Sequence, residues 1–501
     1  MSPLQLSVLW RLSLAFFFNP FLFFLDIFTA VVVEANCHHG NVTRRERTLA
    51  QNQSDSKELS GHESDWMTRN SDRHSVCVWS SGFSYGQTMY MAGMLLGSLV
   101  GGVLADRYGK RPVLLVCLSV QAACGLVPAV LPQPFVFLAV RCLTGVCCSC
   151  ITNCSFSLAV EWTAPSARLW PPVFLGFCFS LGTMGGALLA WLSPSWTQLH
   201  LSLALPQFIC LPLYRSIPES PSWLVLMGRM DVLYLYCNRS EADKQCVDLL
   251  VGSNSLEKTK VPAAPKEQPP NDLPLRHPTI LLRLTIMSYL GAVTALTYFG
   301  ICMNIGSFGV NVYSAQFFSG LSEAPCLLVP LVRLDRRPMS MLTLFLSGTA
   351  CFLSLLLSRY QCDAMLVMSG ALVGKFCILV TIFVLALYSI ELFPTVVRQR
   401  CVSAINLCFR LGCLFSTLFP GNPEGTISLA AMLIYSSGPI IGCGLCLLLP
   451  ETSGTPLPNS MEDCHKPPQH PLERTRKLQS QPPAAVATGE CKRTHNSCQP
   501  V

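Results

Sequence analysis

The chain has 501 residues, of which 51% are hydrophobic and only 13% are charged. That charged share is about half of what a soluble globular protein carries, so a large water-exposed surface, a coiled coil and a disordered chain are all disfavoured. The excess of 35 Lys and Arg over 28 Asp and Glu is no nucleic-acid signature, and it suits the cytoplasmic loops of a polytopic membrane protein.

Twelve stretches are long and apolar enough to cross a bilayer, for which roughly 20 mostly apolar residues are needed. We predict spans at about 9–33, 86–105, 112–133, 135–160, 171–192, 199–217, 284–303, 310–332, 339–358, 364–388, 401–420 and 427–449. The first is interpreted as a retained span rather than a signal peptide, because it is long, contains Asp26 and lacks a convincing cleavage site. Both termini are then cytoplasmic. The expected inner loops are rich in Lys and Arg and the short outer loops contain almost none, which agrees with this orientation.

The polar segment 34–85 is predicted to be an outer loop that is glycosylated at Asn41 and Asn52, each of which begins a sequon. Cys37 and Cys77 are the only cysteines of this loop. A disulfide between them is plausible outside the cell, and two free thiols are the alternative.

These segments divide the chain into four parts. Residues 1–217 are predicted to form the first six-helix half and residues 277–450 the second. Residues 218–276 between them form a central cytoplasmic loop, and residues 451–501 form a polar cytoplasmic tail to which we assign no fold.

Three pairs of charged motifs recur between the two halves in the same order. Segment 102–112 (GVLADRYGKRP) pairs with 334–338 (LDRRP), Glu161 and Arg168 pair with Glu391 and Arg398, and 218–220 (PES) pairs with 450–452 (PET). Their offsets of 226, 230 and 232 residues are nearly equal, which indicates a duplication of one six-helix unit.

Segment 102–112 resembles the loop signature of the major facilitator superfamily. Segments 218–224 (PESPSWL), 298–300 (YFG), 306–310 (GSFGV) and 388–398 (YSIELFPTVVR) resemble the organic ion transporters of solute carrier family 22. Segment 449–458 (LPETSGTPLP) is similar to the organic anion branch of that family. The resemblance implies an all-α membrane protein with twelve transmembrane helices in the major facilitator fold, and transport by alternating access.

Ionisable residues inside a bilayer span are costly, and they tend to mark function or a buried pair. The predicted spans contain five such residues: Asp26, Arg141, Glu323, Lys375 and Arg410. In the second half one acid can neutralise only one of two bases, so a cation remains for an anionic substrate. We therefore expect Arg410, and also Lys375, to bind substrate. The alternative is that backbone carbonyls or water satisfy Arg410. The resemblance favours a substrate role, because the anion branch has arginine at this place.

Aromatic residues near the expected midplane are candidates for the wall of a substrate pocket. They are Tyr298 and Phe299 in the seventh span and Phe177 and Phe179 in the fifth. Packing or lipid contact is the alternative for each of them. The resemblance supports Tyr298 and Phe299, which match an aromatic pair of the anion branch.

Charges at the cytoplasmic helix ends are predicted to form a breakable ion-pair network that closes the inner side of the transporter. The network residues are Asp106, Arg107, Gly109, Glu161, Arg168, Glu391 and Arg398. The alternative is that these charges only set the topology.

No catalytic constellation, no phosphate loop of the GxxxxGK[ST] type and no zinc-like cysteine spacing is present in the sequence. We therefore expect no enzyme, no cofactor, no metal, no ATP and no nucleic-acid partner, and a solute gradient must supply the energy. The predicted function is transport of small organic anions across the plasma membrane, and the resemblance implies exchange against a dicarboxylate. A cation or zwitterion carrier and a non-transporting, receptor-like relative are the alternatives. The second rests on departures from the family, such as Leu327 in place of a lysine and Asp335 in the second inner loop.

Overall fold

The computed structural model describes residues 3–33, 85–131, 133–163, 170–237, 278–325, 335–418 and 429–452. Within these ranges every regular element is a helix. Eight helices of the described part are long and apolar enough to span a bilayer by themselves.

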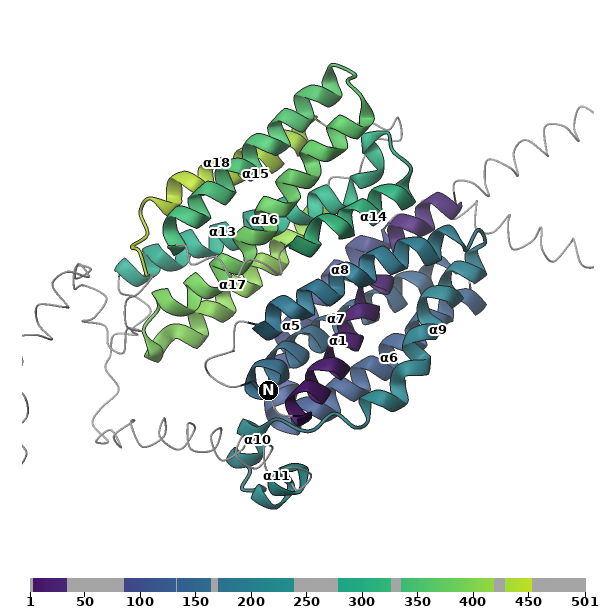
Figure 1. Cartoon of the computed structure of the whole chain (residues 1–501), viewed down its shortest axis with the longest axis vertical. Coiled ribbons are helices and arrows are strands. Elements are labelled where there is room, and N and C mark those ends of the chain that lie inside the picture. The colour runs from purple at the N-terminus through teal and green to yellow at the C-terminus, as the bar shows by residue number, and fades with distance from the viewer. Residues whose placement is uncertain are drawn as a thin grey trace, which may run out of the picture.

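The helices form two bundles that lie side by side (Figure 1). The first consists of α1 (Pro3–Phe23), α5 (Gly86–Tyr108), α6 (Lys110–Val130), α7 (Pro134–Glu161), α8 (Trp170–Trp191) and α9 (Trp196–Tyr214). The second consists of α13 (Pro278–Met303), α14 (Val312–Glu323), α15 (Arg336–Arg359), α16 (Ala364–Leu392), α17 (Thr395–Ser416) and α18 (Leu429–Cys446), with a 3-10 turn, η3 (Ile305–Phe308), before α14. The short helices α10 (Pro221–Leu226) and α11 (Met230–Cys237) follow the first bundle.

We call the end of the bundles at which the chain begins and α10 and α11 lie the α10 end (Figure 1). The first apolar segment runs from this end as Leu4–Val33 and is interrupted at Phe24, after the proline at position 20 has removed one backbone donor from α1. The carbonyl oxygen of Leu22, close to this interruption, accepts a hydrogen bond from Arg141.

Equivalent helices of the two bundles pack in the same way. Helix α6 packs on α9 as α15 packs on α18, and α1 packs on α8 as α13 packs on α17. Repeated sequence motifs therefore come to equivalent places in the two bundles.

Glycines allow α5 and α7 to approach each other closely. A Cβ atom at Gly93 would lie 2.0 Å from the carbonyl oxygen of Cys142, and one at Gly145 would lie 2.1 Å from that of Tyr90. Small residues at such contacts are the usual means of helix association in a bilayer, where the hydrophobic effect supplies no force between helices. The contact fixes the helix that carries Tyr90 against the helix that carries Arg141.

The bundles meet along two pairs of helices, α8 with α14 and α5 with α17. Toward the end opposite to α10, the rings of Phe28 and Tyr313 stack across the bundles, with centroids 5.7 Å apart and an interplanar angle of 3°. The contacts between the bundles thus include an aromatic stack near the end opposite to α10.

Candidate functional site

The first buried ion pair joins the broken first span to α7. The Nε atom of Arg141 donates to Oδ2 of Asp26 at 3.0 Å, and Nη2 donates to the same oxygen. The Nη1 atom donates to the carbonyl oxygen of Leu22 at 2.7 Å, close to the interruption at Phe24. The guanidinium also lies over the ring of Tyr90, 4.5 Å from its centroid. Arg141 is therefore fully engaged within the first bundle.

The second buried pair joins α14 to α16. Nζ of Lys375 lies 2.6 Å from Oε1 of Glu323, and the side chain of Lys375 is completely buried. The Tyr298 hydroxyl donates to Oε1 of Glu323 at 2.5 Å, and Lys375 also donates to the hydroxyl of Ser319. The Ser180 hydroxyl on α8 donates to Oε2 of Glu323 at 3.1 Å, so this network crosses from one bundle to the other.

Arg410 on α17 is the remaining charge of the five. In the described part of the chain it makes no ion pair and no hydrogen bond, and its side chain is only partly buried. It lies on the helix that packs against α5 of the first bundle. Among the described residues, Arg410 is thus the one charge of the five that has no ion-pair partner.

Aromatic rings from both bundles gather around Phe23 and Phe299, and one of them is Phe409, which directly precedes Arg410. Phe299 on α13 stacks on Phe23 with centroids 5.5 Å apart, and it meets Phe409 on α17 edge to face at 6.4 Å. Phe23 also contacts Tyr90 at 5.3 Å and Phe179 at 5.9 Å. We call these five residues the aromatic cluster.

Two of the predicted pocket-wall residues, Tyr298 and Phe177, are not members of the aromatic cluster. Tyr298 contacts the ring of Phe299 at 5.0 Å and turns its hydroxyl to the second ion pair. Phe177 is partly buried and, among the described residues, makes no ring contact. Sequence reasoning missed Phe23, Tyr90 and Phe409 of the cluster. Only Phe409 carried a usable signal, since it directly precedes Arg410.

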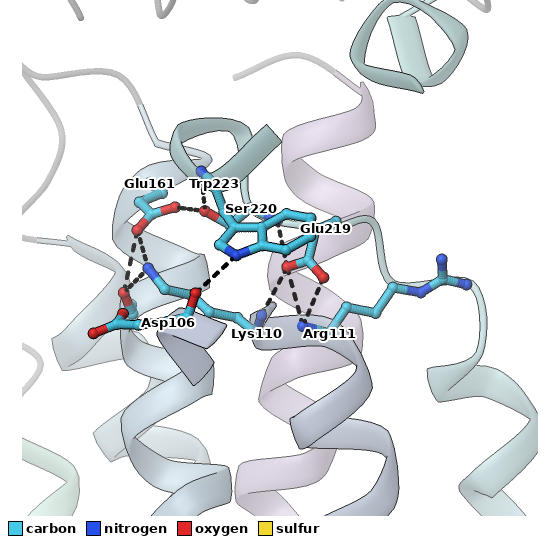
Figure 2. A network of polar contacts seen from close by, with 8 residues as sticks. Asp106, Lys110, Arg111, Glu161, Glu219, Ser220 and Trp223 are labelled. Carbon is cyan, nitrogen blue, oxygen red and sulfur yellow. Dashed lines mark hydrogen bonds and ion pairs between the residues drawn. The ribbon is translucent and has the colours of Figure 1, made fainter. Parts of the chain in front are cut away.

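A polar network ties the ends of α5, α6, α7 and α10 together at the α10 end (Figure 2). Lys110 forms an ion pair with Glu161, whose other oxygen accepts a hydrogen bond from the Ser220 hydroxyl. Oε1 of Glu219 accepts from the backbone N–H groups of Lys110 at 2.9 Å and Arg111 at 3.1 Å. The carboxylate of Glu219 therefore caps the start of α6.

The second bundle contains the equivalent network. Arg336 pairs with Glu391 at 3.3 Å, and the Thr452 hydroxyl donates to Glu391 at 2.7 Å. Glu451 accepts from the backbone N–H groups of Arg336 at 3.0 Å and Arg337 at 2.9 Å. Each network braces its own bundle, and the sequence repeat therefore has a direct structural counterpart.

Three of the predicted gating residues, Glu161, Asp106 and Gly109, belong to the network of the first bundle, each through a different kind of contact. Glu161 is its centre, whereas Asp106 contributes its backbone carbonyl, which accepts from Nε1 of Trp223 at 3.1 Å (Figure 2). Gly109 has a φ of 94°, and a Cβ atom there would lie 2.6 Å from Oε2 of Glu219, so only glycine fits this turn.

Of the remaining predicted network residues, the structure describes Arg107 and Arg398 and does not describe Arg168. Arg107 lies over the ring of Tyr108 at 5.5 Å, and Nε of Arg398 donates to the carbonyl oxygen of Phe393 at 3.0 Å. Outside the described residues are Arg168, Asn41, Asn52, Cys37 and Cys77. The prediction missed the roles of Lys110, Glu219, Ser220, Arg336, Glu451 and Thr452, although all of them belong to the repeated motifs.

Comparison with known proteins places this geometry among membrane transporters. The family model of the Major Facilitator Superfamily matches residues 70–463. Solute carrier family 22 member 6 of Rattus norvegicus is 30% identical over 77% of this chain and 71% of its own length. Organic anion transporter 3 of Oryctolagus cuniculus is 31% identical over 82% of this chain and 76% of its own. An organic cation transporter-like protein of Drosophila melanogaster is 30% identical over 75% of this chain and 69% of its own.

Solved structures show the same fold at low sequence identity. The proton:xylose symporter XylE, bound to 6-bromo-6-deoxy-D-glucose, superimposes with a TM-score of 0.61 at 14% identity, covering 90% of this chain and 97% of that chain. The human organic anion transporter MFSD10 superimposes with a TM-score of 0.51 at 20% identity, covering 89% of this chain and 99% of that chain. The predicted fold class is therefore confirmed.

Proposed function

Because this chain belongs to the major facilitator superfamily, and within it to solute carrier family 22, we propose that it carries small organic anions by alternating access between its two bundles. It is a multi-pass membrane transporter of that family, which is not a family of enzymes. The choice of anions is our proposal, and one observation carries it: Arg410 is the interior cation that remains after the two buried ion pairs have formed.

The surroundings of Arg410 suit an amphipathic anion. A planar guanidinium can bind two oxygens of a carboxylate or sulfate at once. The aromatic cluster beside it offers apolar walls for the organic part of the ligand, and pockets with apolar walls and few fixed polar groups are typical of such sites. Tyr298, whose ring contacts Phe299, and Phe177 are proposed as further wall residues, and Lys375 is a proposed second contact through the network of Glu323.

A cation carrier from the same family is the rival, and one relative is named for organic cations. Such a carrier needs an unpaired interior acid. Asp26 is bound to Arg141, and Glu323 is bound to Lys375. With both of these acids neutralised, the site favours anions over cations.

We also propose that the α10 end faces the cytoplasm of a plasma-membrane protein, with the segment 34–85 outside. The sequons at Asn41 and Asn52, and a disulfide that we propose between Cys37 and Cys77, would suit this orientation. Exchange against an intracellular dicarboxylate is the proposed driving force, in keeping with the resemblance to the organic anion branch.

Uptake by liposomes that contain the purified protein tests the proposal. We expect a radiolabelled aromatic carboxylate to enter faster than a cation of matched size and ring system, and preloading with a dicarboxylate should accelerate its entry. Preferential uptake of the cation would establish the rival instead. Uptake of neither, with correctly folded protein, would support the non-transporting relative.

The polar network of the first bundle is proposed to stabilise one conformation of the transport cycle. Glu161→Gln removes the charge that holds Lys110 and Ser220, so we expect transport per molecule to fall severalfold while the amount of protein in the membrane stays near that of the wild type. Asp106→Asn should slow transport less, because Asp106 binds Trp223 through its backbone. The measurement is flux normalised to surface protein. Equal flux in wild type and Glu161→Gln would leave this network with a role in topology alone.

A further inference from the structure

Three arginines from helices far apart in the sequence meet at the turn that follows α9. Nη1 of Arg11 on α1 donates to the carbonyl oxygen of Ser216 at 2.8 Å. Nη2 of Arg111 on α6 donates to the carbonyl oxygen of Arg215 at 2.7 Å. Arg215 itself is exposed. Two guanidiniums are thus fixed on adjacent carbonyls, next to a third side chain of the same charge. We call Arg11, Arg111 and Arg215 the arginine triplet.

The charge of the triplet is not neutralised in the described part of the chain. None of the ion pairs found there includes any of the three arginines. The nearby carboxylate of Glu219 is engaged with the backbone N–H groups at the start of α6. The Nε atom of Arg111 is buried and has no partner among the described residues. The positive charge of the triplet is therefore available to an anion from outside the chain.

The second bundle provides an internal comparison. Nη2 of Arg337 donates to the carbonyl oxygen of Leu447 at 2.8 Å, as Arg111 does to that of Arg215. Leucine thus stands in the second bundle where the first has Arg215. In both bundles a single arginine donates to the carbonyl oxygen at the helix end. This shared structural role does not require an arginine side chain at position 215.

The triplet lies at the ends of membrane-spanning helices, beside apolar side chains that point outward. Leu6 and Trp10 on α1 are 61% and 66% exposed, and Leu213 at the end of α9 is 54% exposed. Exposed apolar residues on a spanning helix contact lipid tails, and tryptophan is enriched at the level of the headgroups. A ligand held by the triplet would therefore have its charge at headgroup depth with exposed apolar side chains close by.

We propose that the arginine triplet binds the phosphate headgroup of an anionic phospholipid in the leaflet at the α10 end. Guanidinium groups bind phosphate oxygens in pairs, and clusters of basic residues next to a span attract anionic lipids. The adjacent apolar residues distinguish a lipid from a soluble phosphate, because they give the acyl chains a place to lie. This site is separate from Arg410 and does not depend on which solute is transported.

Lipid binding is measured on the purified full chain in nanodiscs that contain phosphatidylcholine with increasing phosphatidylglycerol. Native mass spectrometry counts the phosphatidylglycerol molecules that stay bound. For Arg11→Gln with Arg215→Gln we expect retention to weaken by roughly 30-fold, from about 1 kcal/mol for each arginine near an anionic surface. Arg111 is left intact because its backbone is part of the polar network of the first bundle.

The control is Arg359→Gln, which removes an exposed arginine at the opposite end of α15. We expect it to retain phosphatidylglycerol like the wild type. Equal loss in the control would mean that net charge and not the triplet binds the lipid, which overturns the proposal. Displacement of the lipid by glycerol 3-phosphate at equal concentration would also overturn it in favour of a soluble phosphate ligand. Arg215→Gln alone changes an exposed side chain, so a loss of retention in that variant is not expected to come from misfolding.

Discussion

Arg410→Ala should abolish uptake of organic anions while the protein still reaches the membrane in normal amount. A charged guanidinium near the centre of a span costs on the order of 2.5–3.5 kcal/mol on insertion scales, so its removal does not harm insertion. What the variant loses is the cation that the proposed substrate meets beside Phe299 and Phe409. The measurement is uptake of a matched anion and cation, normalised to surface protein.

Two further variants at this position separate charge from geometry. Arg410→Lys keeps the charge but loses the planar fork, so partial anion uptake is expected. Arg410→Asp reverses the sign and should repel anions and admit cations, if one fixed charge sets the selectivity. Arg359→Ala is the matched control, because it removes an exposed arginine outside the site. Full anion uptake by Arg410→Ala would reduce Arg410 to a structural charge.

Breaking the pair between Glu323 and Lys375 should destabilise the protein strongly. Lys375→Met leaves a carboxylate in the interior without its cation, and removal of one partner of a buried pair typically costs about 3–5 kcal/mol. Replacing both residues, as Glu323→Gln with Lys375→Met, removes both charges and should recover much of that loss. Thermal unfolding of the detergent-solubilised protein is the measurement, with all four combinations compared.

The same double variant tests the proposed role of Lys375 in binding substrate. If stability recovers and anion uptake does not, Lys375 contributes to the anion site. If both recover, its charge serves only the interior pair. Unfolding of Lys375→Met at the temperature of the wild type would contradict the buried pair itself.

The architecture was largely accessible from the sequence. Apolar stretches near 20 residues long predict spanning helices with few alternatives, and the spacing of the motifs predicted that Glu161 and Glu391 occupy equivalent places. The paired networks around these two glutamates follow from that repeat. Even residues whose role was missed, such as Glu219 and Glu451, stood in recognised motifs, and only their backbone partners were unknown.

The pairing of the interior charges was not accessible in the same way. Helices that are apolar all round, such as α16, give no pattern that fixes their rotation about the axis. Whether Glu323 would turn toward Lys375 or toward Arg410 therefore depended on packing between helices. The same limit hid Phe23, whose place in a run of phenylalanines gave no indication that it meets Phe299 of the other bundle.

The bond between Ser180 and Glu323 lies at a close approach of the two bundles. A Cβ atom at Gly320 would stand 3.0 Å from the carbonyl oxygen of Ser180 and 2.9 Å from Cγ of Met184, so the backbones of α14 and α8 nearly touch. In a rocking motion of two rigid bodies, points near the axis move least, so a direct hydrogen bond between the bodies persists most readily there. We therefore expect the contact of α8 with α14 to lie near the axis of such a motion. A larger side chain at position 320 would then push α8 and α14 apart and change how far the two ends of the transporter can open. This effect would not depend on any charge in the substrate site.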